Sequence, residues 1–512
     1  MGAFPFTLNE LWHVAGAQII LVFMILGMIL FDLRYTYHGR TDHINKLGWL
    51  TAVFLIAVLL HLIYQNWHST NVVLTGIFSI EKFAVYVSGL VVFSGLIVTL
   101  LSIGYLRNNQ LVRGEYYILL LMAIYGAVAL IQSIDLLMMF IALEIMSLAV
   151  YVLVAFLKRN VKCLEGAIKY FLLGSFGSAF FLFGLALLYG FSGTLNIGEI
   201  AIYISEAGRY EQLPVLVALA MIMAGLFFKM ALVPFHMWTP DVYEGSPAVI
   251  TGFMATAVKA CAFAVFIKVL FVTFSPLLSK SGNPEFYATT NLAALGAYWK
   301  PLLWWLAIIT MFVGNVTAVS QNNIKRMLAY SSIAHAGYMA VGLVAANDDG
   351  RMGVLFYLFS YTLMNLGAFG VLYILDGQEG RAQTLADYRG LGYKYPALAF
   401  LMSLFLVAMA GLPPTAGFIG KFYVFSAAIK EGYFLLAALG VLTSVIAAYY
   451  YLRVIYMLYM KEPVHDVTRG EVAAPAVIAL VATALGVLYL GILPEGLAEV
   501  ADAAQKSLLM IF

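Results

Sequence analysis

Residues 213–247 have the sequence LPVLVALAMIMAGLFFKMALVPFHMWTPDVYEGSP, which indicates the class of fold. It begins as an apolar run of the length that crosses a bilayer, about 20 residues. Lys229 and Pro234 interrupt the run. A charge is costly in lipid, and a proline removes a backbone hydrogen bond. We therefore expect a membrane-spanning helix that is broken beside a buried lysine, an arrangement typical of ion sites in transporters.

The composition extends this prediction to the whole chain. Of the 512 residues, 63% are hydrophobic and only 11% are charged, and the mean hydropathy is +0.93. These values exclude a water-soluble domain, and the net charge of +2 is too small to indicate nucleic-acid binding. The apolar run at residues 14–33 is too long for the core of a signal peptide and lacks a following cleavage site, so it predicts a retained first helix.

Fourteen apolar runs are long enough to cross the membrane, and short connections join them into one membrane domain. The seventh is broken by Pro234, and the unusually long twelfth by Pro413 and Pro414. The predicted spans are 13–33, 47–65, 77–105, 115–132, 135–157, 166–191, 213–238, 247–274, 301–320, 327–346, 352–375, 396–429, 433–459 and 472–492.

The loop charges predict the orientation. Sixteen of the 28 Lys and Arg residues fall in loops on one side of the membrane and seven on the other. The positive-inside rule assigns the first side to the cytoplasm, which places both termini on the periplasmic side of a bacterial inner membrane. Five lysines remain, because 28 − 16 − 7 = 5, and each falls inside an apolar run: Lys169, Lys229, Lys259, Lys268 and Lys421.

These intramembrane lysines are the main functional clue. Each costs roughly 2.5–3.5 kcal/mol at the centre of a bilayer, so an intramembrane ionisable residue is by default a candidate functional site. Glu144 belongs with them, because it lies ten residues into the fifth span, where the neighbouring residues are uncharged. We expect Lys229 to be its partner. The hypothesis is a proton path through the membrane.

Each position also has a structural interpretation. Lys268 lies near the outer end of its span, so we expect its side chain to snorkel to the interface. Lys169 fits either snorkelling or function, whereas the other three lysines lie too deep to snorkel. Glu144 also fits a structural hydrogen-bonding role. His335 fits either a proton relay or a core histidine, and His236, next to the Pro234 break, is expected to bond freed carbonyls.

Nothing in the chain indicates a redox cofactor. Cys163 and Cys261 form no CxxC pair and no cluster with histidines, so the sequence supports neither an iron–sulfur nor a zinc site. It also lacks a P-loop and a dinucleotide fingerprint. The energy for proton transport must therefore come from a partner.

Four stretches carry a resemblance to a known family. Residues 228–247, FKMALVPFHMWTPDVYEGSP, closely resemble the signature of the antiporter-like membrane subunits of respiratory complex I. The stretches ALEIMSL at 142–148, KRMLAYSS at 325–332 and GLPPTAGF at 411–418 agree with it. The similarity covers about residues 115–460. Lysine at 421 and a short segment after residue 492 resemble the subunit N-like branch rather than the M-like or L-like ones.

The resemblance implies an all-α polytopic fold with two inverted five-helix repeats. Spans 4–8 (115–275) and 9–13 (276–460) would form the repeats, each with a broken helix, between three N-terminal helices (1–114) and a last helix with its tail (461–512). The family's proton path, carried over onto matching positions, would use Glu144, Lys229, Lys259, His335 and Lys421. Lys169 and His236 are secondary candidates from their positions in the chain, and the resemblance does not add them.

The resemblance also implies partners and a mechanism. FMN, iron–sulfur clusters and quinone would belong to partner subunits, and the chain would assemble with other membrane subunits, including antiporter-like neighbours, and not with copies of itself. Two unit charges about 7 Å apart interact by roughly 2 kcal/mol at an effective dielectric constant near 20. Separation of Glu144 from Lys229 would therefore push a proton from Lys259 towards Lys421.

Two other function classes remain open. A subunit of a multisubunit sodium/proton antiporter would share the fold and the buried lysines but would have no redox arm. An assembly scaffold would use the buried charges only as structural pairs. The plastid thylakoid membrane is the alternative location.

Overall fold

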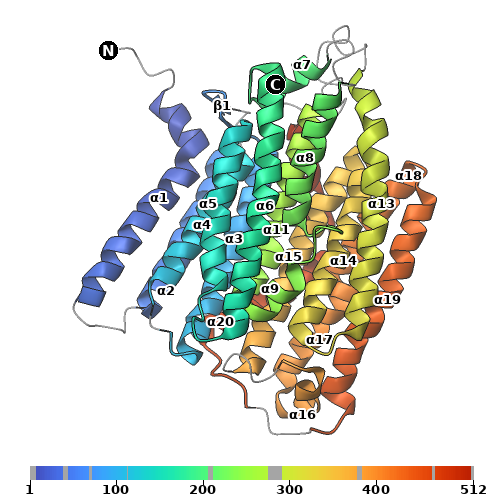
Figure 1. Cartoon of the computed structure of the whole chain (residues 1–512). Coiled ribbons are helices and arrows are strands. Elements are labelled where there is room, and N and C mark those ends of the chain that lie inside the picture. The colour runs from blue at the N-terminus through green and yellow to red at the C-terminus, as the bar shows by residue number, and fades with distance from the viewer. Residues whose placement is uncertain are drawn as a thin grey trace.

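The computed structural model describes residues 7–37, 44–67, 72–111, 113–205, 212–274, 291–377, 383–463 and 468–508. Most of these residues form helices that run between the two ends of a single bundle (Figure 1). Within the described ranges, 13 helices are long and apolar enough to cross a membrane. The twelfth predicted span, 396–429, is instead divided into two shorter helices, so every predicted span has a counterpart in the structure.

The helices that match the first six spans are α1 (Leu8–Tyr37), α2 (Ile44–His61), α3 (Lys82–Asn108), α4 (Glu115–Gln132), α5 (Leu136–Val154) and α6 (Val161–Ser192). A π-helical turn, η1 (Leu62–Asn66), extends α2, and a short helix, α7 (Ile197–Ser205), follows α6. The ninth to eleventh spans are α13 (Asn291–Ser320), α14 (Ile324–Ala345) and α15 (Asp348–Asp376), and the last two are α19 (Phe434–Met460) and α20 (Ala474–Ile492). Two short helical segments, η5 (Leu385–Tyr388) and α16 (Leu391–Lys394), connect α15 to the twelfth span.

The start of the third predicted span is wrong. Residues 77–81 are not helical: β1 (Val72–Leu74) and β2 (Phe78–Ile80) form an antiparallel hairpin, and α3 begins at Lys82. The hairpin turns at Thr75 and Gly76, which both have positive φ angles, 54° and 70°. A left-handed turn of this kind reverses the chain before the helix starts. The apolar run at 77–105 therefore contains two elements, a strand and a helix.

The seventh and twelfth spans are broken where the sequence predicts. The helix α8 (Leu213–Met230) ends at Ala231, which is left-handed at φ 59°, and α9 (Thr239–Gly245) continues after a loop. The helix α17 (Pro396–Ala410) ends at the left-handed Gly411, φ 84°, before α18 (Ala416–Lys430). In both breaks a proline stands three residues after the left-handed residue. The two breaks are therefore built alike, while the inverted relation between the two repeats stays a prediction.

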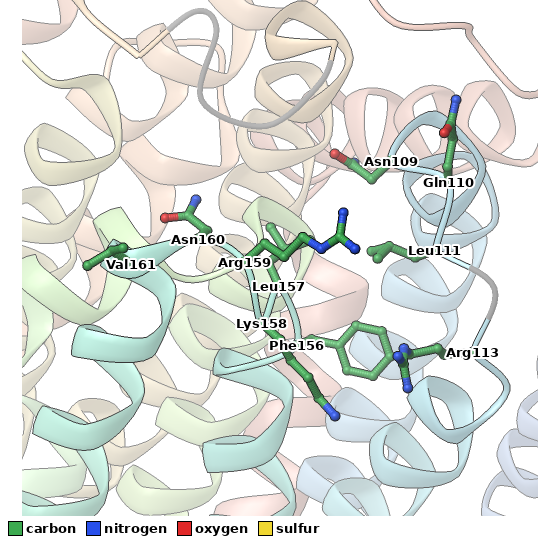
Figure 2. A pocket seen from close by; sticks show the side chains of 10 residues that line it. All are labelled: Asn109, Gln110, Leu111, Arg113, Phe156, Leu157, Lys158, Arg159, Asn160 and Val161. Carbon is green, nitrogen blue, oxygen red and sulfur yellow. The ribbon is translucent and has the colours of Figure 1, made fainter.

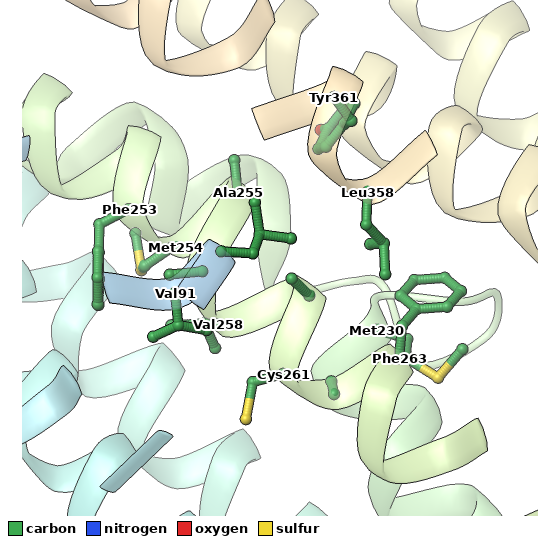
Figure 3. Packing of buried hydrophobic residues seen from close by; sticks show 14 of the residues in the cluster. Val91, Met230, Phe253, Met254, Ala255, Val258, Cys261, Phe263, Leu358 and Tyr361 are labelled. Atoms are coloured by element: carbon green, nitrogen blue, oxygen red, sulfur yellow. The ribbon is translucent and has the colours of Figure 1, made fainter. Parts of the chain in front are cut away.

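The eighth span lies at the centre of the bundle. It runs from Ala248 to Thr273 as α10 (Ala248–Phe253), η2 (Met254–Val258), α11 (Lys259–Lys268) and η3 (Val269–Thr273), and its most apolar 18 residues are all buried. Figure 3 shows part of this packing, with Val258 and Phe263 among apolar side chains of α3, α8 and α15. The segments η2 and η3 are π-helical turns, a feature frequent at functional sites. Lys259 therefore stands beside such a turn and away from lipid.

The segment after the last span is more than a tail. It forms α21 (Glu495–Ser507), and the Ser507 hydroxyl accepts a hydrogen bond of 2.9 Å from the Phe83 backbone N–H at the start of α3. The hairpin and the first turn of α1 lie at the same end of the bundle (Figure 1). The contact between α21 and the start of α3 places α21 at this end too, as an even number of crossings requires. Residues 1–6 and 509–512 lie outside the described ranges.

Candidate functional site

The five intramembrane lysines divide into two groups by their partners. The ammonium group of Lys169 lies 2.7 Å from both Glu165 and Asp241, and that of Lys268 lies 2.8 Å from Glu81. The other three are Lys229, Lys259 and Lys421, and no ion pair joins any of them to a carboxylate of the described chain. These three are 3%, 2% and 5% exposed, so other parts of the protein enclose each of them.

The prediction that Lys268 snorkels is wrong. Its side chain is 1% exposed, and besides Glu81 it donates to the carbonyl oxygens of Ile131, at 2.9 Å, and Ser133, at 3.3 Å. Because the whole eighth span is buried, Lys268 has no lipid-facing route to the interface, and the residue before α3 supplies a carboxylate instead. By contrast, the Lys169 side chain is 41% exposed and reaches the edge of the bundle.

Lys229 lies in the last turn of α8, directly before the first break. Its Nζ donates to the Ser147 hydroxyl at 2.8 Å and to the Tyr151 hydroxyl at 3.3 Å, both on α5. The same Nζ lies 5.4 Å from the centre of the Tyr170 ring on α6. The lysine is therefore held by neutral hydroxyls and an aromatic face.

Glu144 is not the direct partner of Lys229, contrary to the sequence-based expectation. The Ser178 hydroxyl on α6 donates to its carboxylate, and no ion pair between Glu144 and Lys229 occurs in the described structure. Ser147, whose hydroxyl accepts the hydrogen bond from Lys229, follows Glu144 by one turn on the same face of α5. The Lys229 ammonium group is thus bound to α5 one turn after Glu144, through the Ser147 hydroxyl.

Lys259 connects the first half of the chain to α14. Its Nζ donates to the carbonyl oxygen of Ser332 at 2.7 Å and to the hydroxyl of the same residue. His335 follows Ser332 by one helical turn, is 1% exposed, and shares hydrogen bonds with the hydroxyls of Tyr357 at 2.8 Å and Tyr451 at 3.1 Å. The ammonium group of Lys259 on α11 is therefore bound to α14 one helical turn before His335.

Lys421 spans the second break. Its Nζ donates to the carbonyl oxygens of Met409, at 3.1 Å, and Ala410, at 2.8 Å, which end α17. It also donates to the Ser444 hydroxyl of α19 at 2.6 Å and lies 4.9 Å from the centre of the Tyr338 ring. Tyr338 stands one turn beyond His335 on α14, so Lys421 adjoins the histidine through this ring.

One chemical pattern unites the three lysines, because each donates to a serine hydroxyl. The serines are Ser147, Ser332 and Ser444, and sequence reasoning did not single them out. A hydroxyl both donates and accepts, so it can pass a proton between neighbours. Ser147 and Ser332 could have been found from their spacing of three residues from Glu144 and His335, whereas nothing in the sequence marks Ser444.

Charged residues of a different kind gather at the end of α9. Arg326 lies 2.6 Å from Asp241 and 2.9 Å from Glu244, and Lys162 lies 2.7 Å from Glu244. Together with Lys169, these pairs fix the second half of the broken span to α6 and α14. His236 lies half-buried in the break, and none of its described contacts is with the three hydroxyl-bound lysines.

The arrangement matches a known family. The family described as NADH:quinone oxidoreductase/Mrp antiporter, TM, matches residues 133–447, which contain Glu144, His335 and all five intramembrane lysines. The NADH-quinone oxidoreductase subunit N of Trichlorobacter lovleyi is 39% identical over 501 residues, 97% of this chain and 98% of that protein. The NADH-quinone oxidoreductase subunit N 1 of Chloroherpeton thalassium is 44% identical over 417 residues, 81% of this chain and 83% of that protein.

Two solved structures share the fold. A chain of respiratory complex I from Thermus thermophilus, solved with bound aureothin, is 32% identical and superposes with a TM-score of 0.74 over 94% of this chain and 98% of that chain. A chain of the Mrp complex from Dietzia sp. DQ12-45-1b is 20% identical with a TM-score of 0.81 over 98% of both chains, which shows the fold alone. Since both the family match and these relatives cover most of the sequence, the chain belongs to the antiporter-like membrane subunits of NADH:quinone oxidoreductase, and within them to the subunit N proteins.

Proposed function

We propose that protons move through this chain, a membrane subunit of a complex I-type NADH:quinone oxidoreductase, along Glu144, Lys229, Lys259, His335 and Lys421. The observation that carries the proposal is the hydroxyl partner of each lysine. Ser147, Ser332 and Ser444 hold the three ammonium groups, and no described carboxylate pairs with them. The path is therefore a row of exchangeable groups across both halves of the chain.

The partners decide which lysines can exchange a proton. An ammonium paired with a buried carboxylate stays charged, because loss of its proton would leave an uncompensated charge in the interior. Lys268 beside Glu81 is of this kind. Lys229, Lys259 and Lys421 have only neutral partners, so each can lose or gain a proton without exposing a bare carboxylate.

Glu144 supplies the negative charge at the start of the row. It stands one turn from Ser147 on α5, close enough for its protonation state to act on Lys229 through space. A charged Glu144 carboxylate favours the protonated form of Lys229. Protonation of Glu144 removes this preference. Changes at Glu144 would therefore alter Lys229 and, through it, the next lysine in the row.

The energy must enter from outside the chain. Moving one charge against each 100 mV costs about 2.3 kcal/mol, and the described residues offer no group of metal-binding side chains. FMN, iron–sulfur clusters and quinone would be held by partner subunits, and contact with a neighbouring membrane subunit would transmit the redox step. The chain would work beside antiporter-like neighbours and not as a homo-oligomer.

The proposed location is a bacterial inner membrane with both termini in the periplasm. The loop charges support this orientation, because the end of the bundle that holds Arg113, Lys158 and Arg326 is also the richer in Lys and Arg. Lys82 and Lys430 are among the few cations at the opposite end.

Alanine at Lys229 or at Glu144 tests the proposal. Each variant should assemble and should pump fewer protons per NADH oxidised, measured in proteoliposomes with the intact complex. Lys430→Ala is the matched control, because Lys430 pairs with Asp349 on the surface, 2.6 Å away. Full pumping in both test variants would remove these residues from the path.

A further inference from the structure

A basic pocket of about 890 Å³ opens at one end of the bundle, away from the proton path. Two loops form it: the α3–α4 loop supplies Asn109, Gln110, Leu111 and Arg113, and the α5–α6 loop supplies residues 156–161. Figure 2 shows Arg159 extending from the second loop towards Leu111 of the first, and Arg113 beside the ring of Phe156. The pocket is therefore a gap between two pairs of helices.

The side chains that line the pocket carry positive charge and no negative charge. Its lining includes Arg113, Lys158 and Arg159 and no acidic residue. No ion pair of the described residues involves any of these three cations. Each is exposed to the surroundings of the bundle. Three cations in a lining that holds no carboxylate are suited to a multiply charged anion.

Neighbouring cations at the same end behave differently. Lys162 lies 2.7 Å from Glu244, only a few residues after the pocket loop. Arg326 contacts both Asp241 and Glu244, and Arg107 pairs with Glu471. Carboxylates are thus present nearby and are used by other cations, so the absence of one in the pocket lining distinguishes this site from the rest of the surface.

The height of the pocket identifies the anion. It lies where α3 ends at Asn108, α4 begins at Glu115, α5 ends at Val154 and α6 begins at Val161. All four helices are membrane spans, so the pocket is level with the lipid headgroups. Apolar side chains share its lining, and among them Val161 is 77% exposed. A lipid with a phosphate in its headgroup would fit both the cationic and the apolar side chains of the lining. Its phosphate would contact the cations, and its acyl chains would cover the apolar side chains.

We propose that this pocket binds the phosphate-bearing headgroup of an anionic membrane lipid. Basic pockets between transmembrane helices on the cytoplasmic side recognise such headgroups. The amide side chains of Asn109, Gln110 and Asn160 would add neutral donors to the lipid's phosphate and glycerol oxygens. The lipid would join the α3–α4 pair to the α5–α6 pair. The inference does not depend on the proton path.

A photoreactive phosphatidylglycerol probe, added to the delipidated intact complex, tests the proposal. Mass spectrometry of the cross-linked peptides should place the probe on residues 109–113 and 156–161. The same photoreactive group on phosphatidylethanolamine, which has no net charge, should label these peptides much less. Unlabelled phosphatidylglycerol should compete, and inorganic phosphate at the same concentration should not.

The matched variants carry equal changes in charge. Each Lys or Arg near a membrane surface strengthens binding of anionic lipid by about fivefold, so R113Q/R159Q should require roughly 30-fold more probe for half-maximal labelling. The control K46Q/K461Q removes two cations from the same end of the bundle, outside the pocket, and should leave labelling unchanged.

Four results would overturn the proposal. Equal labelling by the two lipid probes would show that charge does not select the ligand. Equal competition by inorganic phosphate would show a site for a free anion and not for a lipid. Unchanged labelling in R113Q/R159Q, or no cross-link to either loop, would show that the pocket is occupied by something else, such as an acidic segment of a neighbouring subunit.

Discussion

The ammonium group of Lys421 lies 2.8 Å from the carbonyl oxygen of Ala410, so a side chain of α18 caps the end of α17 across the second break. The last carbonyls of a helix have no partner within it and attract cations. In the first break this role falls to Trp238, whose indole N–H donates to the carbonyl oxygen of Phe228 at 3.1 Å. Lys229 lies on α8, the helix that ends at the first break, and its ammonium group reaches Ser147 of α5.

Glycine at position 411 is required by this geometry, and alanine there should impair both stability and pumping. The left-handed backbone, φ 84°, costs a residue with a Cβ roughly 1–2 kcal/mol. A Cβ would also lie 2.9 Å from Cδ and 3.0 Å from Nζ of Lys421. We expect Gly411→Ala to lower the thermal unfolding temperature of the complex and its proton yield.

The first break provides the reverse substitution as a control. Ala231 has φ 59° in the equivalent place, so Ala231→Gly should relieve strain, by about 1 kcal/mol, and leave pumping unchanged. If Gly411→Ala were as stable and as active as the parent, the break would not constrain Lys421.

The serine partners should be needed for proton transfer and not for assembly. A hydrogen bond to a charged group contributes about 1.5–3 kcal/mol, so Ser147→Ala or Ser332→Ala should change the protonation equilibrium of the neighbouring lysine roughly 10- to 100-fold. Pumping by the assembled complex should fall in each variant. Ser94→Ala is the matched control, because Ser94 is equally buried but bonds only the Leu90 carbonyl oxygen of its own helix. Equal loss in the control would assign the effect to packing.

The buried pair of Glu81 and Lys268 should be structural. Removing one member leaves an unpaired buried charge, so Glu81→Gln or Lys268→Met should destabilise the chain by about 3–5 kcal/mol. The amount of assembled complex in the membrane should fall accordingly. The double variant, which removes both charges, should recover much of the loss, and pumping per assembled complex should stay normal. Normal assembly with lost pumping would instead place the pair in the proton path.

The sequence predicts the architecture well because lipid imposes simple rules. Apolar length gives the spans, and Pro234, Pro413 and Pro414 give the two breaks. The hairpin before α3 was missed, because an apolar strand and the start of an apolar helix have the same composition. Two short helices, α7 and α21, were missed because neither has the length of a span.

The sequence predicts which residues form the site, because their type is unusual in an apolar run. It does not predict which residues they contact. A lysine in an apolar run is conspicuous in the sequence, and its depth can be counted from the ends of the run. Whether a carboxylate lies opposite that lysine depends on which segment of the chain packs against its helix. Lys268 meets Glu81, which lies 187 positions earlier in the chain, whereas Lys229 meets Ser147 and not Glu144. Such contacts follow from how the helices pack around the eighth span, and no local pattern specifies them.

We propose that lysines bound to hydroxyls carry protons and that lysines paired with carboxylates do not. Proton yield per NADH oxidised, measured in proteoliposomes with equal amounts of assembled complex, tests it directly. Lys229→Met, Lys259→Met and Lys421→Met should each lower the yield, whereas Lys169→Met, whose parent residue pairs with Glu165 and Asp241, should retain it. A full yield in all three of the first variants, or an equal loss in Lys169→Met, would show that the partner of a lysine does not decide whether it carries protons.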